Sequence, residues 1–158
     1  MQFFVQFYTK FVDIFITRGM YKMVLSGLKN TAIITLGALL IGVTIGMIIA
    51  VIKYFAEDSK ALKPLAWLCD LYTTVVRGIP VVVLLMIFYY IILVSANGIT
   101  VAIIAFGINS GAYMAELIRA GLQSVEKGQE EAADSLGMNG YLKMRFIILP
   151  QAIKVTLP

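Results

Sequence analysis

A run of twenty residues without a charged side chain, from Ile33 to Ile52, constrains this chain more than any other feature. At about 1.5 Å per residue, a helix of this length crosses the ~30 Å hydrocarbon core of a bilayer. The composition also favours lipid as the solvent, because 60% of the 158 residues are hydrophobic and only 14% are charged. Soluble domains are closer to half apolar and a quarter charged. We therefore expect an all-α membrane protein.

Two more apolar segments follow the first, and each is predicted to cross the membrane. The spans are expected at about residues 31–52, 79–95 and 99–118. Pro80 suits the start of the second span, because a proline in the first turn of a helix removes no hydrogen bond. In the first span, Gly42 and Gly46 are four residues apart, a spacing that permits close approach of a neighbouring helix. Helix packing is the preferred interpretation of these glycines, and a hinge is the alternative.

The N-terminal segment, residues 1–26, is rich in aromatic side chains and weakly amphipathic. This pattern predicts a helix that lies in the headgroup region, with its rings at the boundary. An aromatic segment packed against the first span is an equally good interpretation. Between the first two spans, residues 53–77 are predicted to form a loop with an amphipathic middle that lies at the interface.

The distribution of Lys and Arg predicts the orientation of the spans, because these residues favour the cytoplasmic side. One side of the predicted topology holds nine of them and the other side holds four. The nine are Lys53, Lys60, Lys63, Arg77, Arg119, Lys127, Lys143, Arg145 and Lys154, and the four are Lys10, Arg18, Lys22 and Lys29. The N-terminus is therefore expected outside and residues 120–158 in the cytoplasm.

Several kinds of chemistry are excluded or disfavoured by composition. The chain has no His, and its only Cys is Cys69, so neither an intrachain disulfide nor a CxxC metal site can form. There is no Gly-x-x-x-x-Gly-Lys-Ser/Thr loop for nucleotide phosphates. The net charge of +4 fits cytoplasmic-face Lys and Arg better than nucleic-acid binding. We expect no catalytic residue, metal or cofactor, and no nucleic-acid partner.

A short helical hairpin is predicted after the third span. Residues 128–136 should form a helix in which Gln129, Ala132, Ala133 and Leu136 share one face, since they are spaced i, i+3, i+4 and i+7. The two alanines make this face narrow enough to enter a groove on a partner. Gly137 suits the left-handed position that ends a helix. A second helix over residues 141–148 should then be limited by Pro150. A solvated hairpin without a partner is the alternative.

Three polar residues, Asn109, Tyr113 and Glu116, share one face of the third span at spacings of i, i+4 and i+7. Polar groups at membrane depth commonly line a water-filled path, which makes these residues candidates for lining a translocation path. Interhelical hydrogen bonding is an equally common role. For Glu116, an ion pair with Arg119 at the membrane edge is the favoured interpretation.

The hairpin carries a longer pattern: Glu131-Ala132-Ala133, three residues, Gly137, nine residues, Ile147, one residue, and Leu149-Pro150. This pattern resembles the cytoplasmic "EAA" loop of membrane subunits of ABC importers. Three other segments resemble the subfamily of permeases for polar amino acids. They are residues 77–80 (Arg-Gly-Ile-Pro), residues 111–119 (Gly-Ala-Tyr-Met-Ala-Glu-Leu-Ile-Arg) and residues 127–129 (Lys-Gly-Gln). Ile79 departs from the usual Thr and Thr74 from a frequent Glu, and the similarity covers roughly residues 27–158.

The resemblance implies a type I ABC importer transmembrane fold over residues 27–158. It also implies that the fold is truncated after the coupling loop at about 120–158, with two further spans missing. It assigns ATPase coupling to Gly128, Gln129, Glu131, Ala132, Ala133, Gly137, Ile147, Leu149 and Pro150. It implies a multi-pass subunit of the cell membrane that does not hydrolyse ATP itself. Its partners would be ABC ATPase subunits, an extracytoplasmic amino-acid-binding protein, a second permease subunit and the lipid bilayer.

Two alternatives to this function stay open. One is a permease for another small solute, such as methionine or an inorganic anion. The other is a non-transporting membrane scaffold or a truncated remnant, which the expected loss of two spans favours and the intact coupling residues disfavour.

Overall fold

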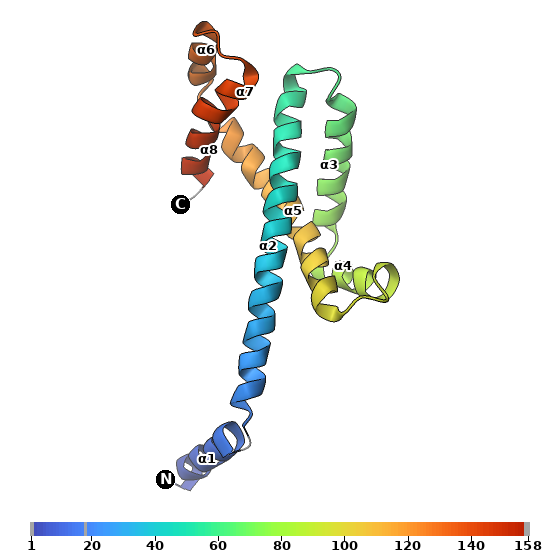
Figure 1. Cartoon of the computed structure of the whole chain (residues 1–158), viewed down its shortest axis with the longest axis vertical. Helices are drawn as coiled ribbons and strands as arrows, with labels where there is room; N and C mark the ends of the chain where they lie inside the picture. Colours follow the sequence, from blue (N-terminus) through green and yellow to red (C-terminus); the bar gives the residue numbers. More distant parts are fainter. Residues whose placement is uncertain (1, 18, 157–158) are drawn as a thin grey trace. The chain divides into compact units, whose positions relative to one another are not determined.

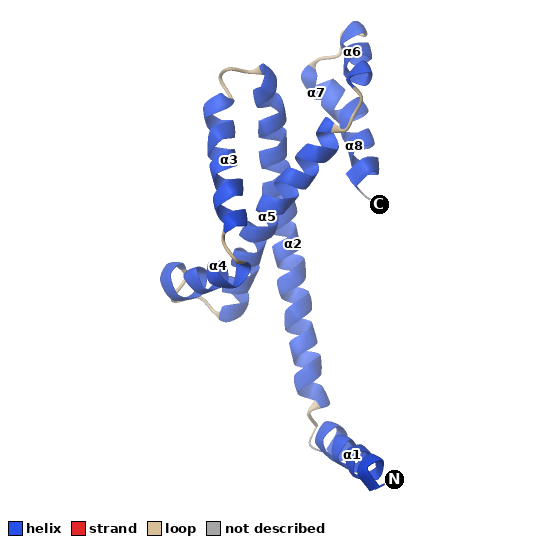
Figure 2. Ribbon diagram, turned by 180° about the vertical axis from the view of Figure 1, so that it is seen from behind, coloured by secondary structure: helices blue, strands red, loops and turns tan. Residues whose placement is uncertain are grey.

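The computed structural model describes residues 2–17 and 19–156, and within these ranges every regular element is a helix (Figure 2). This agrees with the all-α prediction. The chain divides into two compact units, Met1–Leu36 and Gly37–Pro158. Helix α2 (Tyr21–Asp58) begins in the first unit and continues into the second.

The first unit contains α1 (Gln2–Val12), the π-helical turn η1 (Asp13–Thr17) and the start of α2. Gly19 lies just before α2 with a φ of +68°, a conformation that glycine adopts without steric cost. The rings of Phe7, Phe11 and Phe15 stack along one face, with centroid separations of 6.5 and 5.2 Å. An interfacial position for residues 1–26 stays a prediction. Arg18, which contributes to the predicted orientation, lies outside the described residues.

The second unit is built on the C-terminal part of α2, α3 (Lys63–Gly78) and α5 (Gly98–Gln123). Figures 1 and 2 agree that α3 lies beside α2 and that α5 crosses them. Between α3 and α5 the chain forms α4 (Val81–Ile87) and the π-helical turn η2 (Phe88–Ile92). After α5 come α6 (Lys127–Ser135), α7 (Gly140–Lys143), the π-helical turn η3 (Met144–Ile148) and α8 (Leu149–Thr156).

Among the described residues, two helices are long and apolar enough to cross a membrane, Tyr21–Glu57 and Gly98–Gln123. A third span arises only if Lys63–Gly78 and Val81–Ile92 are counted together, and that pair is bent by 105°. Pro80 explains the bend, because the residue before a proline is disfavoured in helical geometry and Ile79 is extended. The predicted interfacial loop is therefore largely a helix, α3, and the three-span topology stays a prediction.

Glycines mark the place where α2 and α5 cross. A Cβ atom added to Gly46 would lie 2.6 Å from Met114 Cβ and 2.9 Å from the backbone nitrogen of Ala115, and one added to Gly42 would collide with the Ser110 side chain. From the other helix, a Cβ on Gly107 would lie 2.7 Å from Ile41 Cβ. Each helix thus presents glycines to the other, and the two backbones approach too closely for larger residues.

Helix α3 packs against both long helices through small and aromatic side chains. Cys69 of α3 forms a buried cluster with Ile49 of α2 and Ala115 of α5. One turn further, the hydroxyl of Tyr72 donates a hydrogen bond of 2.6 Å to the backbone carbonyl of Ile108. These contacts place the middle of α3 alongside the C-terminal half of α2 and the middle of α5.

Candidate functional site

The C-terminal hairpin, residues 124–156, is anchored by an apolar cluster at the ends of α2 and α5. Leu122 is 1% exposed and Ile148 is fully buried, and they pack with Ala50 and Met144. Val125 and Ala152 complete the buried cluster. The hairpin is therefore held to the two long helices by large side chains that interlock.

The turn of the hairpin forms as its sequence predicts. Helix α6 ends before Gly137, whose φ is +72°, the left-handed value expected there. The backbone N–H of Met138 donates to the carbonyl of Ala133, which closes the turn at 3.1 Å. Asn139 then caps α7, since its side-chain oxygen accepts a 3.0 Å hydrogen bond from the N–H of Leu142. Two short helices with a sharp turn are confirmed.

Pro150 does not limit the second helix, so that prediction is wrong. The helix passes through it, because η3 immediately precedes α8 and the proline lies in the first turn of α8. A π-helical turn shifts the hydrogen-bond register. The N–H of Leu149 donates to the carbonyl of Met144 across this turn, and Pro150, which has no N–H to donate, follows directly.

The four residues predicted to share one exposed face of α6 divide into two groups. Gln129, Ala132 and Leu136 are exposed, and Leu136 is 79% exposed. Ala133 is only 2% exposed, because α6 packs this side against its own chain at η3. The surface available to a partner therefore includes Ala132, whereas Ala133 supports the hairpin from inside.

The remaining residues assigned to coupling lie on α6 and on the second arm of the hairpin, formed by η3 and α8. Gly128 and Glu131 are exposed, as is Pro150, while Ile147 and Leu149 are half-buried. Leu149 packs against the anchoring cluster. The side-chain amide of Gln151 donates a 3.3 Å hydrogen bond to the side-chain oxygen of Gln129, which ties α8 to α6.

An acidic cavity of about 460 Å³ separates α6 from the end of α2. Its lining includes the carboxylates of Glu57, Glu130, Glu131 and Asp134. Polar contacts cross it: the hydroxyl of Tyr54 donates to Glu130 at 3.1 Å, and the amide of Gln123 donates to Glu57 at 2.8 Å. Asp134 pairs with Lys143 at 2.9 Å. The first contact joins α6 to α2, the second joins α5 to α2, and the third joins α6 to α7.

The predicted polar face of α5 separates into different environments. Tyr113 is 51% exposed, and the Arg77 guanidinium lies 5.4 Å from its ring centroid, within range for a cation–π contact. Asn109 is half-buried. Glu116 instead pairs with Arg119 at 3.4 Å, the favoured interpretation, and also with Lys53 of α2 at 2.6 Å. Path lining by Asn109 and Tyr113 stays a prediction.

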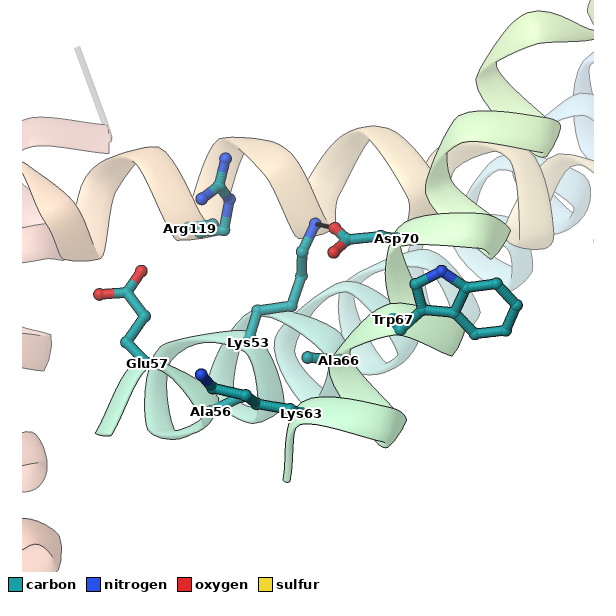
Figure 3. Close-up of a pocket in the computed structure, with 8 residues that line it drawn as sticks. All are labelled: Lys53, Ala56, Glu57, Lys63, Ala66, Trp67, Asp70 and Arg119. Carbon is teal, nitrogen blue, oxygen red and sulfur yellow. Dashed lines mark ion pairs between the residues drawn. The ribbon is translucent and has the colours of Figure 1, made fainter. Parts of the chain in front are cut away.

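Lys53 joins three helices, a role that the sequence did not reveal. It reaches Glu116 of α5 and also Asp70 of α3, at 2.7 Å (Figure 3). The two carboxylates lie 17 and 63 residues from Lys53 along the chain. Apart from the charge of Lys53 at the end of an apolar run, no local signal indicates these contacts.

Lys53 and Asp70 also border a second cavity of about 460 Å³ between α2 and α3, together with Trp67 and Arg119 (Figure 3). Its lining carries both charges, with Lys53, Lys63 and Arg119 positive and Glu57 and Asp70 negative. Within residues 2–17 and 19–156, no group of three or more Cys, Asp or Glu side chains could hold a metal ion.

Comparison with known proteins places this arrangement in a family. Residues 42–158 match the model of the family described as binding-protein-dependent transport system inner membrane component. A probable amino-acid ABC transporter permease from Bacillus subtilis, YckA, is 40% identical over 141 residues, which cover 87% of this chain and 60% of that protein. A putative glutamine transport system permease from Rickettsia prowazekii, GlnP, is 42% identical over 77% of this chain and 55% of its own length.

A solved structure is also similar. It is described as an amino acid ABC transporter with histidines, is 39% identical, and gives a TM-score of 0.68 over 85% of this chain and 66% of that chain. The chain thus spans between about half and two thirds of the length of these relatives. Together with its apolar helices, these similarities show a membrane protein with the type I ABC importer fold that the sequence predicts. The chain belongs to the family of binding-protein-dependent transport system inner membrane components.

Proposed function

We propose that this chain is a membrane-spanning permease subunit of an ATP-driven, binding-protein-dependent importer of polar amino acids. The observation that carries the proposal is the hairpin at α6–α8. Its sequence matches the coupling pattern, with Glu131 and Ala132 exposed. Its turn has left-handed geometry at Gly137, and its interior is anchored on the ends of α2 and α5. The amino-acid transporters to which the chain is similar support the class of substrate.

In the proposed complex, this chain lies in the cell membrane as a multi-pass protein and binds no cofactor. ATP is hydrolysed by partner ATPase subunits, which dock on the exposed side of α6. A second permease subunit completes the path, and an extracytoplasmic protein delivers the amino acid. Closure of the ATPases displaces α6 and changes the side from which the path is open. Such a shift requires the partners to contact the two states differently.

The docking surface can be tested by exploiting the neighbouring alanines of α6. In Ala132→Trp the new side chain points outward, so it should fill the groove of the partner and leave the hairpin intact. Overpacking typically costs ~1–3 kcal/mol, which lowers docking by roughly ten- to a hundredfold. The measurements are co-purification with the ATPase and substrate-stimulated ATP hydrolysis in membranes that contain the complete transporter. Limited proteolysis of the hairpin shows whether it stays folded.

Two variants complete this experiment. Lys154→Trp adds the same ring at an exposed position of α8 and should leave docking and hydrolysis unchanged. Ala133→Trp places the ring inside the hairpin and should increase proteolysis as well as abolish docking. If Ala132→Trp docks and stimulates hydrolysis like the parent protein, α6 is not the docking helix, and a non-transporting scaffold becomes the better explanation.

A further inference from the structure

Lys53, Asp70 and Glu116 form a three-helix ion bracket whose centre is a single ammonium group. The Lys53 side chain is 8% exposed, and its Nζ lies 2.7 Å from an Asp70 oxygen and 2.6 Å from a Glu116 oxygen. Figure 3 shows Lys53 extending from α2 toward Asp70 on α3. A buried ammonium group without such partners would be strongly unfavourable. Lys53 therefore holds α2, α3 and α5 together for as long as its charge stays buried.

The two halves of the bracket differ in strength. Glu116 is 25% exposed and Asp70 is 60% exposed, so water weakens the link to α3 more than the link to α5. Arg119, 3.4 Å from Glu116, provides a second cation, and its Nε is buried with no hydrogen-bond partner among the described residues. The α2–α5 link is thus reinforced, whereas the Asp70 link to α3 is the one that can open at low cost.

The bracket lies directly next to the coupling hairpin. Glu116 precedes the end of α5 by seven residues, about 10 Å along a helix. On α2, Lys53 is followed by Tyr54, which hydrogen-bonds to Glu130 of α6. A displacement of α6 therefore acts on the same ends of α2 and α5 that carry two members of the bracket.

The third member carries the connection to the other end of α3. Helix α3 leads from Asp70 to Arg77, whose guanidinium lies over the Tyr113 ring, and then to the 105° bend at Ile79 and Pro80. Val76 and Leu84, on the two sides of this bend, pack with Ala112 of α5 in one cluster. A movement of α3 is thus passed to the bend and to the exposed polar face of α5.

We propose that Lys53 is a positioning residue that transmits displacement of the coupling hairpin to α3 and its bend through Asp70. The role rests on the proposed function of the hairpin as an ATPase docking site. The proposal also places Glu116 in the ion bracket and not in the lining of a translocation path. The bracket itself can be tested without any partner, so the two proposals can fail separately.

Cys69 provides a natural reporter, because it is the only cysteine of the chain and is 8% exposed between Ile49 and Ala115. Its reaction with a small maleimide, in membrane vesicles that contain the full chain without ATPase, measures how often α3 separates from its neighbours. Asp70→Ala removes only the link to α3 and leaves Lys53 paired with Glu116. Labelling should become about tenfold faster, equivalent to ~1.4 kcal/mol.

Two further variants test the chemistry of the bracket. Lys53→Arg keeps the cation and should restrict labelling nearly as well as the parent chain, whereas Lys53→Met should label at least as fast as Asp70→Ala. Lys63→Met is the matched control, since Lys63 borders the same cavity without belonging to the bracket. If Asp70→Ala and Lys53→Met label no faster than Lys63→Met, the bracket does not hold α3 and the proposal is overturned.

Transmission is then measured in the complete transporter. Asp70→Ala should dock the ATPase and hydrolyse ATP, but should transport several-fold less substrate per ATP than the parent, and Lys53→Arg should retain the parental ratio. If the bracket had a purely structural role, Asp70→Ala would lower docking, hydrolysis and transport together. That result would overturn the proposal that Lys53 transmits displacement of the hairpin to α3. If the parent chain itself recruits no ATPase, the proposed function fails, and so does the proposed transmission from the hairpin to α3. The labelling result, which shows only whether the bracket holds α3, is still valid.

Discussion

The crossing of α2 and α5 and the anchorage of the hairpin are packed in opposite ways. At the crossing, Gly46 and Gly107 have no side chain, and atoms of the facing helix occupy the place where a Cβ would lie. At the anchorage, Leu122 and Ile148 fill the space themselves and are essentially buried. The crossing therefore depends on missing side chains, and the anchorage depends on large ones.

The solvent expected around each region explains the contrast. Between helices in lipid there is no hydrophobic driving force, because lipid tails are as apolar as the side chains, so close backbone approach supplies the attraction. The hairpin is predicted to lie in the cytoplasm, where removing Ile148 and Leu122 from water is itself favourable. Adding volume should therefore harm the crossing, and removing volume should harm the anchorage.

The largest effect is expected for Ile148→Ala, which empties the centre of the anchoring cluster. Such truncations cost ~2–5 kcal/mol, since the lost transfer energy is added to a cavity. Hydrogen exchange of the amides in α7 and α8 should accelerate accordingly, while exchange in α2 changes little. Ile147→Ala is the matched control, because Ile147 is only half-buried. Equal acceleration by the two variants would contradict the cluster as the anchor.

A somewhat smaller effect is expected for Gly46→Leu, which adds volume at the crossing. Overpacking typically costs ~1–3 kcal/mol, and here the obstacle includes the backbone of Ala115, which cannot rotate away. The midpoint of thermal unfolding in detergent should fall. Gly27→Leu is the control in the same helix, because a Cβ atom at Gly27 would meet no atom of the described residues within 4 Å. Equal midpoints for the two variants would refute close packing at the crossing.

The smallest effect is expected when a helix N-cap is removed, and the same kind of cap occurs in both regions. Asn139 caps α7 in the hairpin, and Asn97 caps α5 by accepting a 2.8 Å hydrogen bond from the N–H of Thr100. Replacing either by Ala should cost ~1 kcal/mol, because one exposed helix end loses its partner. Hydrogen exchange should speed up in the first turn of α7 or α5, respectively. An Asn139→Ala effect as large as that of Ile148→Ala would show that the cap, and not burial, holds the hairpin.

Features that depend on neighbouring residues were predicted well. The hairpin follows from local rules, since Gly137 permits the left-handed turn that was predicted. Asn139 obeys the same kind of rule as the N-cap of α7, although the prediction did not include it. The helical nature of the apolar runs likewise follows from their length and lack of charge. The sequence also indicates the partner of the first glycine pair at the crossing. Gly107 and Gly111 of α5 have the same four-residue spacing as Gly42 and Gly46 of α2, although the prediction did not use it.

Predictions failed where a choice depended on residues distant in the chain. Helical spacing groups Ala132 with Ala133, but only the packing of α6 on η3 decides that Ala133 points inward. Pro150 indicates a helix end by local rules, yet the helix continues through it, directly after a π-helical turn that shifts the hydrogen-bond register. Within the segment predicted as a loop with an amphipathic middle, Lys63–Gly78 forms α3, which packs against α5.

By itself, the sequence determined that this chain forms apolar helices followed by a sharply turned hairpin, because charge, length and turn chemistry act within a few residues. Only the tertiary structure decided which helix α3 packs against, and which cation neutralises Glu116. Lys53 and Glu116 are 63 residues apart, and their interaction depends on a separation of 2.6 Å that no local pattern encodes. Electrostatic energy falls with distance in space, so ion pairs that join separate helices follow from the packing of those helices.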